Sequence, residues 1–306
     1  MTDLGRQLFS FSVALTAALL NLGCTLPPAA PAPPPLLAAV PSPMGMAVDW
    51  TTVYVARRAQ APVLAVDITH GTVTPVGVEG GAGAIAVDVH DLYWTDDSGV
   101  YACDKSNCPG TRITLAGDAA TDIAIDSDNV YWSVQNPAGP GRIMKVGKTG
   151  GAPSQVVEFG SPRRLAVDGQ YVYWIDAIGV LAVPIEGGAP MQLAVLDAPD
   201  TTALALGQDL VYFLTAQGQL FQVSKSGGTG KVLLSDLGDS PTGLAVDGQN
   251  LYVTGSEMLL KMPAGGGPVY TLAAPLDQPA RIILDPQNVY AADEASGIIV
   301  KVPKQP

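Results

Sequence analysis

A unit of about 40 residues recurs seven times along the chain, and no other feature narrows the possible folds as far. Each copy has an Asp position followed five residues later by Tyr, and Gly207 is the one departure at the Asp position. Successive Asp positions are 39, 38, 42, 39, 40 and 38 residues apart. This period is typical of a four-stranded β-propeller blade and fits a two-helix repeat poorly. The Asp positions are Asp49, Asp88, Asp126, Asp168, Gly207, Asp247 and Asp285, and the tyrosines are Tyr54, Tyr93, Tyr131, Tyr173, Tyr212, Tyr252 and Tyr290.

Each copy divides into four short β-rich runs separated by turn residues. The first run, residues 85–88 in the second copy, is apolar on both faces, as expected of a strand packed between neighbouring sheets. The second run carries the Tyr, and in four copies the next residue is aromatic, which indicates side chains that fill the layers between blades. A Gly-Gly turn with positive φ is expected after the third run. The aromatic residues are Trp94, Trp132, Trp174 and Phe213, and the Gly-Gly pairs are 150–151, 187–188, 227–228 and 265–266.

The last copy stops after its third run, and its fourth strand can come from the N-terminal side of the repeats. Residues 36–40, which precede the first full copy, resemble the fourth run at 270–274. Pairing residues 36–40 with the last copy would close the ring and remove an exposed sheet edge. The sequence therefore predicts an all-β fold over residues 36–306: a seven-bladed β-propeller whose N-terminal strand closes the last blade, with six blades as the alternative.

The N-terminal residues read as an export signal. The apolar run at residues 8–22 is shorter than the roughly 20 residues that span a bilayer and fits the core of a signal peptide over residues 1–23. Residues 20–24 resemble a bacterial lipobox, in which the thiol of Cys24 would be lipidated. Asn21 stands where such boxes usually carry Leu, and Arg6 is offset by Asp3, so secretion without lipid and an unprocessed anchor stay open. Residues 24–35 are Pro-rich and predict a semi-rigid tether.

Composition limits the partners. The chain has 28 acidic and 16 basic residues and a net charge of −12, so its surface should repel nucleic acids and anionic lipid headgroups. With 47% hydrophobic and 14% charged residues, it can bury a large core. We expect an exported monomer, in the bacterial cell envelope or secreted, that does not bind nucleic acid and meets the membrane only through a lipid anchor.

Two further cysteines, Cys103 and Cys108, flank a four-residue segment. Cysteines across a short turn can reach disulfide geometry, and export would place them where disulfides persist. A two-ligand metal fragment is the competing interpretation. It is the weaker one, because structural zinc takes four ligands and the chain has only His70 and His90 besides. The sequence therefore favours a disulfide.

The motif Tyr-Trp-Thr-Asp at residues 93–96, preceded by Ile-Ala-Val-Asp at 85–88, resembles the YWTD repeat of the propellers in low-density lipoprotein receptor ectodomains. Residues 131–133 and 173–176 are similar to the repeats of secreted bacterial propellers, many of them predicted lipoproteins. The resemblance covers residues 36–306 and implies blade architecture, although the receptor rings have six blades and only residues 93–96 reproduce the full motif. In that family the motif builds blades and performs no chemistry, so it leaves function open.

A candidate site lies one residue before the first run of each copy, where a propeller has the mouth of its central channel. Four copies place Gly or Ala there, at Gly45, Ala84, Ala203 and Gly243, whereas the others place Asp122, Arg164 and Arg281. Charges at a narrow, partly dry mouth can hold a polar ligand. An ordinary solvated rim is the alternative. Further rim candidates on the same face are Arg163, Asp96, Asp97 and Asp176, with Arg57, Arg58, Asp200, Asp239, Glu257, Asp293 and Glu294 beyond them.

The sequence predicts no catalytic residue, cofactor or metal ligand. The recurring Asp is expected to accept turn N–H groups on the opposite face, where His70 and His90 also fall. Our first hypothesis is therefore a non-enzymatic binding or scaffold propeller for a protein, peptide or glycan. The second is a lactonase-like hydrolase or a lyase that uses rim carboxylates and a metal in the channel. A module that serves mainly as a stable surface is the third.

Overall fold

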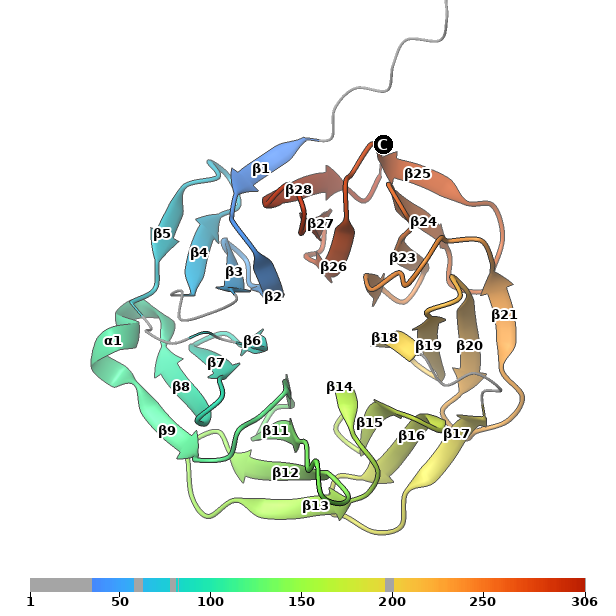
Figure 1. The fold of residues 1–306 in the computed structure, drawn as a ribbon. Coiled ribbons are helices and arrows are strands. Elements are labelled where there is room, and N and C mark those ends of the chain that lie inside the picture. Colours follow the sequence, from blue (N-terminus) through green and yellow to red (C-terminus); the bar gives the residue numbers. More distant parts are fainter. Residues whose placement is uncertain (1–34, 58–62, 78–80, 82, 196–200, 306) are drawn as a thin grey trace, which may run out of the picture. The chain divides into compact units, whose positions relative to one another are not determined.

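Seven antiparallel sheets of four strands each stand around a common axis as the blades of a ring (Figure 1). The computed structural model describes residues 35–57, 63–77, 81, 83–195 and 201–305, within the compact unit Pro33–Pro306. The innermost strands contact one another in cyclic order, and the last, β26 (Pro279–Leu284), contacts the first, β2 (Pro43–Val48). The predicted all-β, seven-bladed propeller is confirmed, and six blades is wrong. The signal peptide, Cys24 and most of the tether lie outside the described residues and stay predictions.

In blades 1 to 6 the strands pair from the axis outward in chain order. Blade 1 contains β2, β3 (Thr52–Arg57), β4 (Leu64–Asp67) and β5 (Val73–Pro75). Blade 2 contains β6 (Ile85–Val87), β7 (Asp91–Thr95), β8 (Val100–Asp104) and β9 (Ile113–Ala116), with the helical turns η1 (Lys105–Asn107) and α1 (Cys108–Thr111) before β9. Blade 3 contains β10 (Asp122–Ile125), β11 (Asn129–Val134), β12 (Arg142–Gly147) and β13 (Ser154–Glu158).

The second half of the ring repeats this arrangement. Blade 4 contains β14 (Arg163–Val167), β15 (Tyr171–Asp176), β16 (Gly179–Pro184) and β17 (Met191–Val195). Blade 5 contains β18 (Thr201–Leu206), β19 (Leu210–Thr215), β20 (Leu220–Ser224) and β21 (Lys231–Leu234). Blade 6 contains β22 (Leu244–Val246), β23 (Asn250–Thr254), β24 (Leu259–Pro263) and β25 (Tyr270–Ala273). In the described part of the chain, no helix has the length and apolar character needed to cross a membrane.

Blade 7 joins the two ends of the propeller, as predicted. It contains β26, β27 (Asn288–Asp293) and β28 (Ile298–Pro303), and its outermost strand is β1 (Leu36–Ala39). Strand β1 pairs antiparallel with β28, with Ala39 opposite Ile298. The pairing continues beyond β1, because the N–H of Val40 donates to the carbonyl of Gly297 at 2.7 Å.

The predicted aromatic layers lie between blades. Tyr131 of blade 3 shares a buried cluster with Trp174 of blade 4, and Tyr173 of blade 4 shares the next cluster with Phe213 of blade 5. All four side chains are at least 99% buried. Since each large ring is enclosed by two sheets, burial of the aromatic layer stabilises the ring of blades rather than a single sheet.

The recurring Asp is a turn residue, as predicted, and it also bonds to two partners that the sequence did not reveal. Asp168 Oδ1 accepts the backbone N–H groups of Gln170 and Tyr171, while Oδ2 accepts the Tyr173 hydroxyl at 2.8 Å. The Lys225 ammonium, from the turn after the third strand of the next blade, reaches the same Oδ2 at 2.8 Å. Equivalent Lys–Asp pairs link the blades at Lys105–Asp49, Lys148–Asp88 and Lys304–Asp247.

The Gly-Gly turns have positive φ as predicted in three blades, and one pair was placed a residue too early. In blade 6 the positive φ values fall on Gly266 and Gly267, at +93° and +143°, and not on Gly265. The turn begins at Pro263, the last residue of β24, whose carbonyl accepts the N–H of Gly266 at 2.9 Å. Three consecutive glycines left this register ambiguous in the sequence.

The predicted disulfide partners lie together in blade 2. Cys103, at the end of β8, and Cys108, at the start of α1, have Cα atoms 4.9 Å apart, and their sulfurs are bonded to each other in the structure. Oxidation of the two thiols to a disulfide in the native protein stays a prediction, and the mass of the unreduced chain would test it.

Candidate functional site

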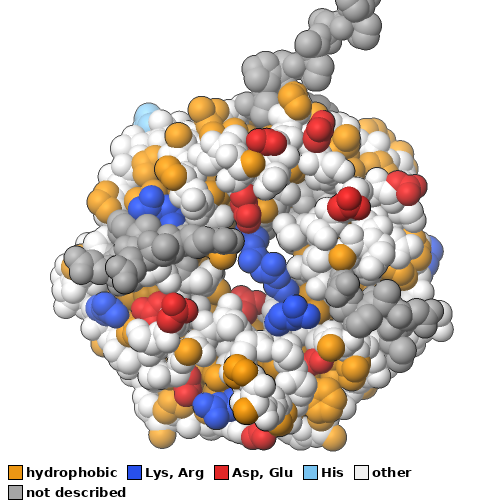
Figure 2. Space-filling model, in the orientation of Figure 1, with side chains coloured by type: hydrophobic (Ala, Val, Ile, Leu, Met, Phe, Trp, Pro, Cys, Tyr) orange, Lys and Arg blue, Asp and Glu red, His pale blue; other side chains and the backbone are white. Residues whose placement is uncertain are grey.

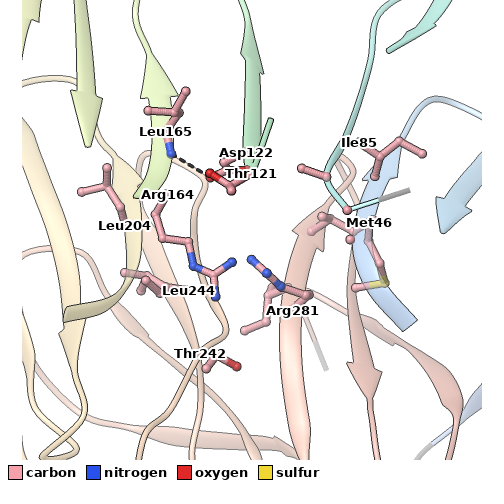
Figure 3. Close-up of a pocket in the computed structure, with 16 residues that line it drawn as sticks. Met46, Ile85, Thr121, Asp122, Arg164, Leu165, Leu204, Thr242, Leu244 and Arg281 are labelled. Carbon is pink, nitrogen blue, oxygen red and sulfur yellow. Dashed lines mark hydrogen bonds between the residues drawn. The ribbon is translucent and has the colours of Figure 1, made fainter. Parts of the chain in front are cut away.

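A cavity of about 200 Å³ opens at the axis, where the innermost strands begin. Arg164, Arg281 and Asp122 contribute the charged groups of its wall, and most of the remaining wall is small or aliphatic. Figure 3 shows Arg164 and Arg281 entering from opposite strands with their guanidinium groups directed toward each other. In Figure 2, Lys or Arg side chains form a band across the central opening. The structure therefore brings together the three charged channel residues that the repeat singled out.

Arg164 is held in the cavity by an unusual backbone. It lies in β14, where the pairing with β15 shifts between Arg163 and Ala166, as in a β-bulge. Its φ is +55°, a left-handed conformation that is unfavourable for residues with a Cβ atom. The guanidinium Nε donates to the Thr202 carbonyl of the next blade at 3.1 Å. The bulge and this hydrogen bond together fix the direction of the side chain.

Arg281 enters from a second bulge. The pairing of β26 with β27 shifts between Pro279 and Ile282, and this interval contains Arg281. Bulges re-aim side chains, and the irregularities at the start of β14 and of β26 turn both arginines toward the axis. Asp122, by contrast, lies at the start of β10, whose pairing with β11 has no shift.

Asp122 is half-buried and bonded on both carboxylate oxygens. Oδ2 accepts the backbone N–H of Leu165 in the next blade at 2.8 Å, and Oδ1 accepts the N–H of Ile123 at 3.0 Å. Burial raises the pKa of Asp122, although the positive charges of Arg164 and Arg281 oppose that rise. Asp122 thus joins two blades and partly neutralises the two arginines.

The positive charges outnumber the negative ones here. Burial, together with the charge of Arg281, lowers the pKa of Arg164 to about 10, so its guanidinium still carries its charge at neutral pH. Arg163 adds a third positive charge nearby, whereas Asp122 and Glu294 supply the negative charges that act on Arg164. A chain with a net charge of −12 therefore carries a locally basic channel mouth.

A recess of about 320 Å³ adjoins the cavity and shares Thr121, Asp122, Arg164 and Thr242 with it. Thr201 also lines this recess, and its side chain is buried with 7% of the residue exposed. Among the described residues, the Thr201 hydroxyl has no hydrogen-bond partner. A buried hydroxyl without a partner is costly in a folded protein. We call Asp122, Arg164, Arg281 and Thr201 the channel-mouth site.

Sequence reasoning missed the threonines around the channel, although the repeat carries a signal for three of them; Thr201 lies one residue further upstream and has no such signal. The position just before the channel residue is Thr121, Thr202 and Thr242 in blades 3, 5 and 6, and Arg163 in blade 4. Aligning the copies one residue further upstream would have shown a polar position next to the charged one. Arg163, one of the rim candidates, is exposed and lines the recess.

Three other rim candidates lie away from the cavity. Asp176 is 3% exposed, and its carboxylate accepts the N–H groups of Ser161 and Ala177, so it braces a loop. Asp96 accepts the N–H groups of Ser98 and Gly99 within its own turn. Asp97 follows it on the exposed surface. The structure does not bring these side chains together with the channel-mouth site.

Of the remaining rim candidates, Asp293 is buried and bonded to a neighbouring loop, and two others lie outside the described residues. Asp293 is 2% exposed, and burial would raise its pKa, but N–H groups of Gln278 and Asp277 hold it below the usual value. Arg58 and Asp200 lie outside the described residues. Where the structure describes the chain, no three His, Cys, Asp or Glu side chains are grouped so that they could hold a metal ion.

No protein-family model and no curated protein sequence matches this chain. Solved structures do match in fold. Virginiamycin B lyase from Staphylococcus aureus has a TM-score of 0.71 at 13% identity over 86% of this chain and 94% of its own. BamB from Moraxella catarrhalis has a TM-score of 0.56 at 15% identity, over 88% of this chain and 85% of its own. PorZ of Porphyromonas gingivalis has a TM-score of 0.63 at 12% identity, over 87% of this chain and 37% of its own.

At these identities the similarity establishes the propeller fold and nothing finer. The matched structures include a lyase and a surface component of a secretion system, so the shared architecture serves different functions. The YWTD-like resemblance of the repeats is not supported by a matching family model. Function must therefore be argued from the channel-mouth site of this chain.

Proposed function

We propose that this protein is an exported, non-enzymatic binding propeller that holds a protein, peptide or glycan ligand at the mouth of its central channel. The observation that carries the proposal is the convergence of Arg164, Arg281 and Asp122, from three separate blades, on one cavity. Ligand pockets are concave and often lie where strand ends and loops surround an opening, as at the mouths of β-barrels. The neighbouring wall is small or aliphatic, which leaves room for a ligand.

Charge supports binding over metal-assisted chemistry. Two guanidinium groups that face one cavity repel a divalent cation and attract an anionic or strongly polar group. The carboxylates Asp96, Asp176 and Asp293 hold backbone N–H groups in loops and so are engaged elsewhere. We therefore do not propose the hydrolase or lyase with a channel metal.

Export is supported by sequence and fold. Residues 8–22 read as a signal-peptide core, and PorZ, described as a bacterial surface component, has a propeller of the same kind. Attachment through Cys24 belongs to the same proposal. Globomycin, which blocks lipoprotein signal processing, should shift the mass of the chain if Cys24 is lipidated, and no shift would remove the anchor.

A capture experiment tests the binding role. The full chain and the variant Asp122→Ala/Arg164→Ala/Arg281→Ala are each used to capture proteins and glycans from solubilised envelope, followed by mass spectrometry. A control, Asp209→Ala/Arg112→Ala/Lys231→Ala, removes the same charges from exposed positions elsewhere. We expect at least one partner to be retained by wild type and control and lost by the channel-mouth variant. Equal recovery of every partner by all three would overturn the proposal.

A further inference from the structure

We infer that the channel-mouth site binds one small oxyanion group, a carboxylate, phosphate or sulfate, carried at the end of the ligand. The inference rests on the proposed function, because the oxyanion would belong to the ligand held there. Arg164, Arg281 and the free Thr201 hydroxyl are the groups that would bind it.

The two arginines need a shared negative partner. Their guanidinium groups face each other across the cavity, and each raises the electrostatic energy of the other (Figure 3). Asp122 supplies one negative charge, but its oxygens already accept the N–H groups of Leu165 and Ile123. An oxyanion placed between the guanidiniums would relieve their repulsion and accept charge-assisted hydrogen bonds from both, for which arginine is especially suited.

The Thr201 hydroxyl is an independent observation that points to an oxygen-rich ligand. Thr201 lines the recess beside Arg164, and the described residues offer its buried hydroxyl no partner. A hydroxyl donates one hydrogen bond, and an oxyanion is a strong acceptor. Binding would therefore satisfy a buried polar group that is otherwise left unpaired.

The site is formed before any ligand enters. The Arg164 backbone is held at a φ of +55° within a bulge, and its side chain is fixed by the Thr202 carbonyl. Strained backbone of this kind clusters at binding sites, and a side chain fixed in advance loses little entropy when a ligand binds.

The cavity size limits how much of the ligand enters. A volume of about 200 Å³ holds roughly seven molecules of water at about 30 Å³ each. This is enough for an oxyanion of four or five heavy atoms and a few waters. The remainder of the ligand would extend into the adjoining recess of about 320 Å³ or lie over the rim.

Titration calorimetry of the full chain with defined anions tests the inference. The probes are acetate, galacturonate, inorganic phosphate and sulfate, at constant ionic strength with chloride as the background ion. We expect at least one probe to bind saturably with one site, and the responding probe identifies the source as a carboxylate, phosphoryl or sulfate group. The double variant Arg164→Gln/Arg281→Gln should weaken the binding of that probe at least about tenfold, since each substitution removes a charge-assisted hydrogen bond.

Thr201→Val separates binding from folding. Valine has nearly the same shape and removes only the unpaired hydroxyl, so thermal stability should be unchanged or higher while anion affinity falls several-fold. A structural role for Thr201 would instead lower the melting temperature. Lys231→Gln removes an exposed positive charge from the outermost strand of blade 5 and should leave affinity unchanged.

The outcomes distinguish the inference from the proposed function. If no probe binds, or if binding survives in Arg164→Gln/Arg281→Gln, the oxyanion site is wrong even where the capture experiment shows a lost partner. If a probe binds as expected but the channel-mouth variant captures every partner, the oxyanion site stands and the proposed function is wrong.

Discussion

Arg164 illustrates how a single residue at the proposed binding site can work against stability. A left-handed backbone costs a residue with a Cβ atom about 1–2 kcal/mol, and Arg164 adopts one at a φ of +55°. Its positive charge is also partly buried beside that of Arg281, which lowers its pKa. Neither feature stabilises the fold. The left-handed backbone positions the side chain, and the guanidinium places a positive charge at the channel mouth, as the proposed function requires.

Replacing Arg164 by glycine tests this interpretation. Because glycine adopts a φ of +55° without strain, Arg164→Gly should leave the free energy of unfolding unchanged or raise it by up to about 1 kcal/mol. Arg281→Gly is the matched control, since its φ lies outside the left-handed region and glycine there adds only backbone entropy to the unfolded state. Urea denaturation should find Arg164→Gly the more stable of the two. The reverse order would contradict the strain argument.

Asp122 predicts how anion binding depends on pH. Burial raises the pKa of Asp122, so on acidification it is neutralised earlier than an ordinary Asp. Protonation removes a negative charge that faces Arg164 and Arg281, so the affinity for sulfate, which stays doubly charged, should rise as pH falls from 7 to about 4. Calorimetry at several pH values checks the sign. The variant Asp122→Asn should bind more tightly at neutral pH and lose the dependence.

At the scale of the element, an Asp–Tyr–Lys cluster connects four of the seven blades to the next blade through an ion pair. Blade 5 lacks both the Asp and the Lys of this cluster. Gly207 replaces the Asp, Ala264 stands where the next blade would supply Lys, and the Tyr212 hydroxyl donates to the Ala264 carbonyl at 3.3 Å. A Cβ at Gly207 would lie 2.9 Å from the Tyr212 ring. The tyrosine therefore occupies space that an Asp would need.

Two tyrosine variants compare the complete cluster with the incomplete one. Tyr173→Phe removes a hydroxyl that donates to the Asp168 carboxylate at 2.8 Å and should cost about 1–2 kcal/mol of unfolding free energy. Tyr212→Phe removes only the longer bond to a carbonyl and should cost less than about 1 kcal/mol. The urea midpoints of the two variants measure the difference. Equal midpoints would mean that the carboxylate adds nothing to this interface.

At the scale of the whole molecule, the ring is closed by strand β1, which comes from the opposite end of the described chain. Ala38 of β1 is buried in a cluster with Tyr290, Ile299 and Val53, which belong to blades 7 and 1. Without β1, the edge of β28 would present unpaired backbone groups, which promote aggregation. The closure therefore protects the sheet edge and packs the first blade against the last.

Neighbouring alanines in β1 test this closure. Ala38→Asp places a carboxylate in the buried cluster and should cost at least about 3 kcal/mol, with aggregation visible by light scattering. Ala39→Asp places the same group on the exposed side of the strand and should change stability by no more than about 0.5 kcal/mol. If both variants unfold at the same urea concentration, β1 does not contribute as proposed.

The number of blades and their order could be predicted from the chain because the relevant information is local. The Asp, Tyr and Gly-Gly positions report turns and strands within one copy, and neighbouring copies pack alike, so the ring follows from the repeat. Comparing the copies also exposed Asp122, Arg164 and Arg281, because equivalent residues lie at the same depth in the channel. The closure through residues 36–40 followed in the same way, from a strand that one copy lacked.

The contacts between blades could not be predicted from the pattern within one copy. The link from Lys225 to Asp168 joins residues 57 positions apart, and its existence depends on how two sheets are placed side by side. The bulge and left-handed φ at Arg164, the unpaired Thr201 hydroxyl and the loop role of Asp176 are likewise set by the surroundings of each residue. A local pattern specifies which strand a residue occupies, whereas only the folded ring brings side chains from different blades within bonding distance.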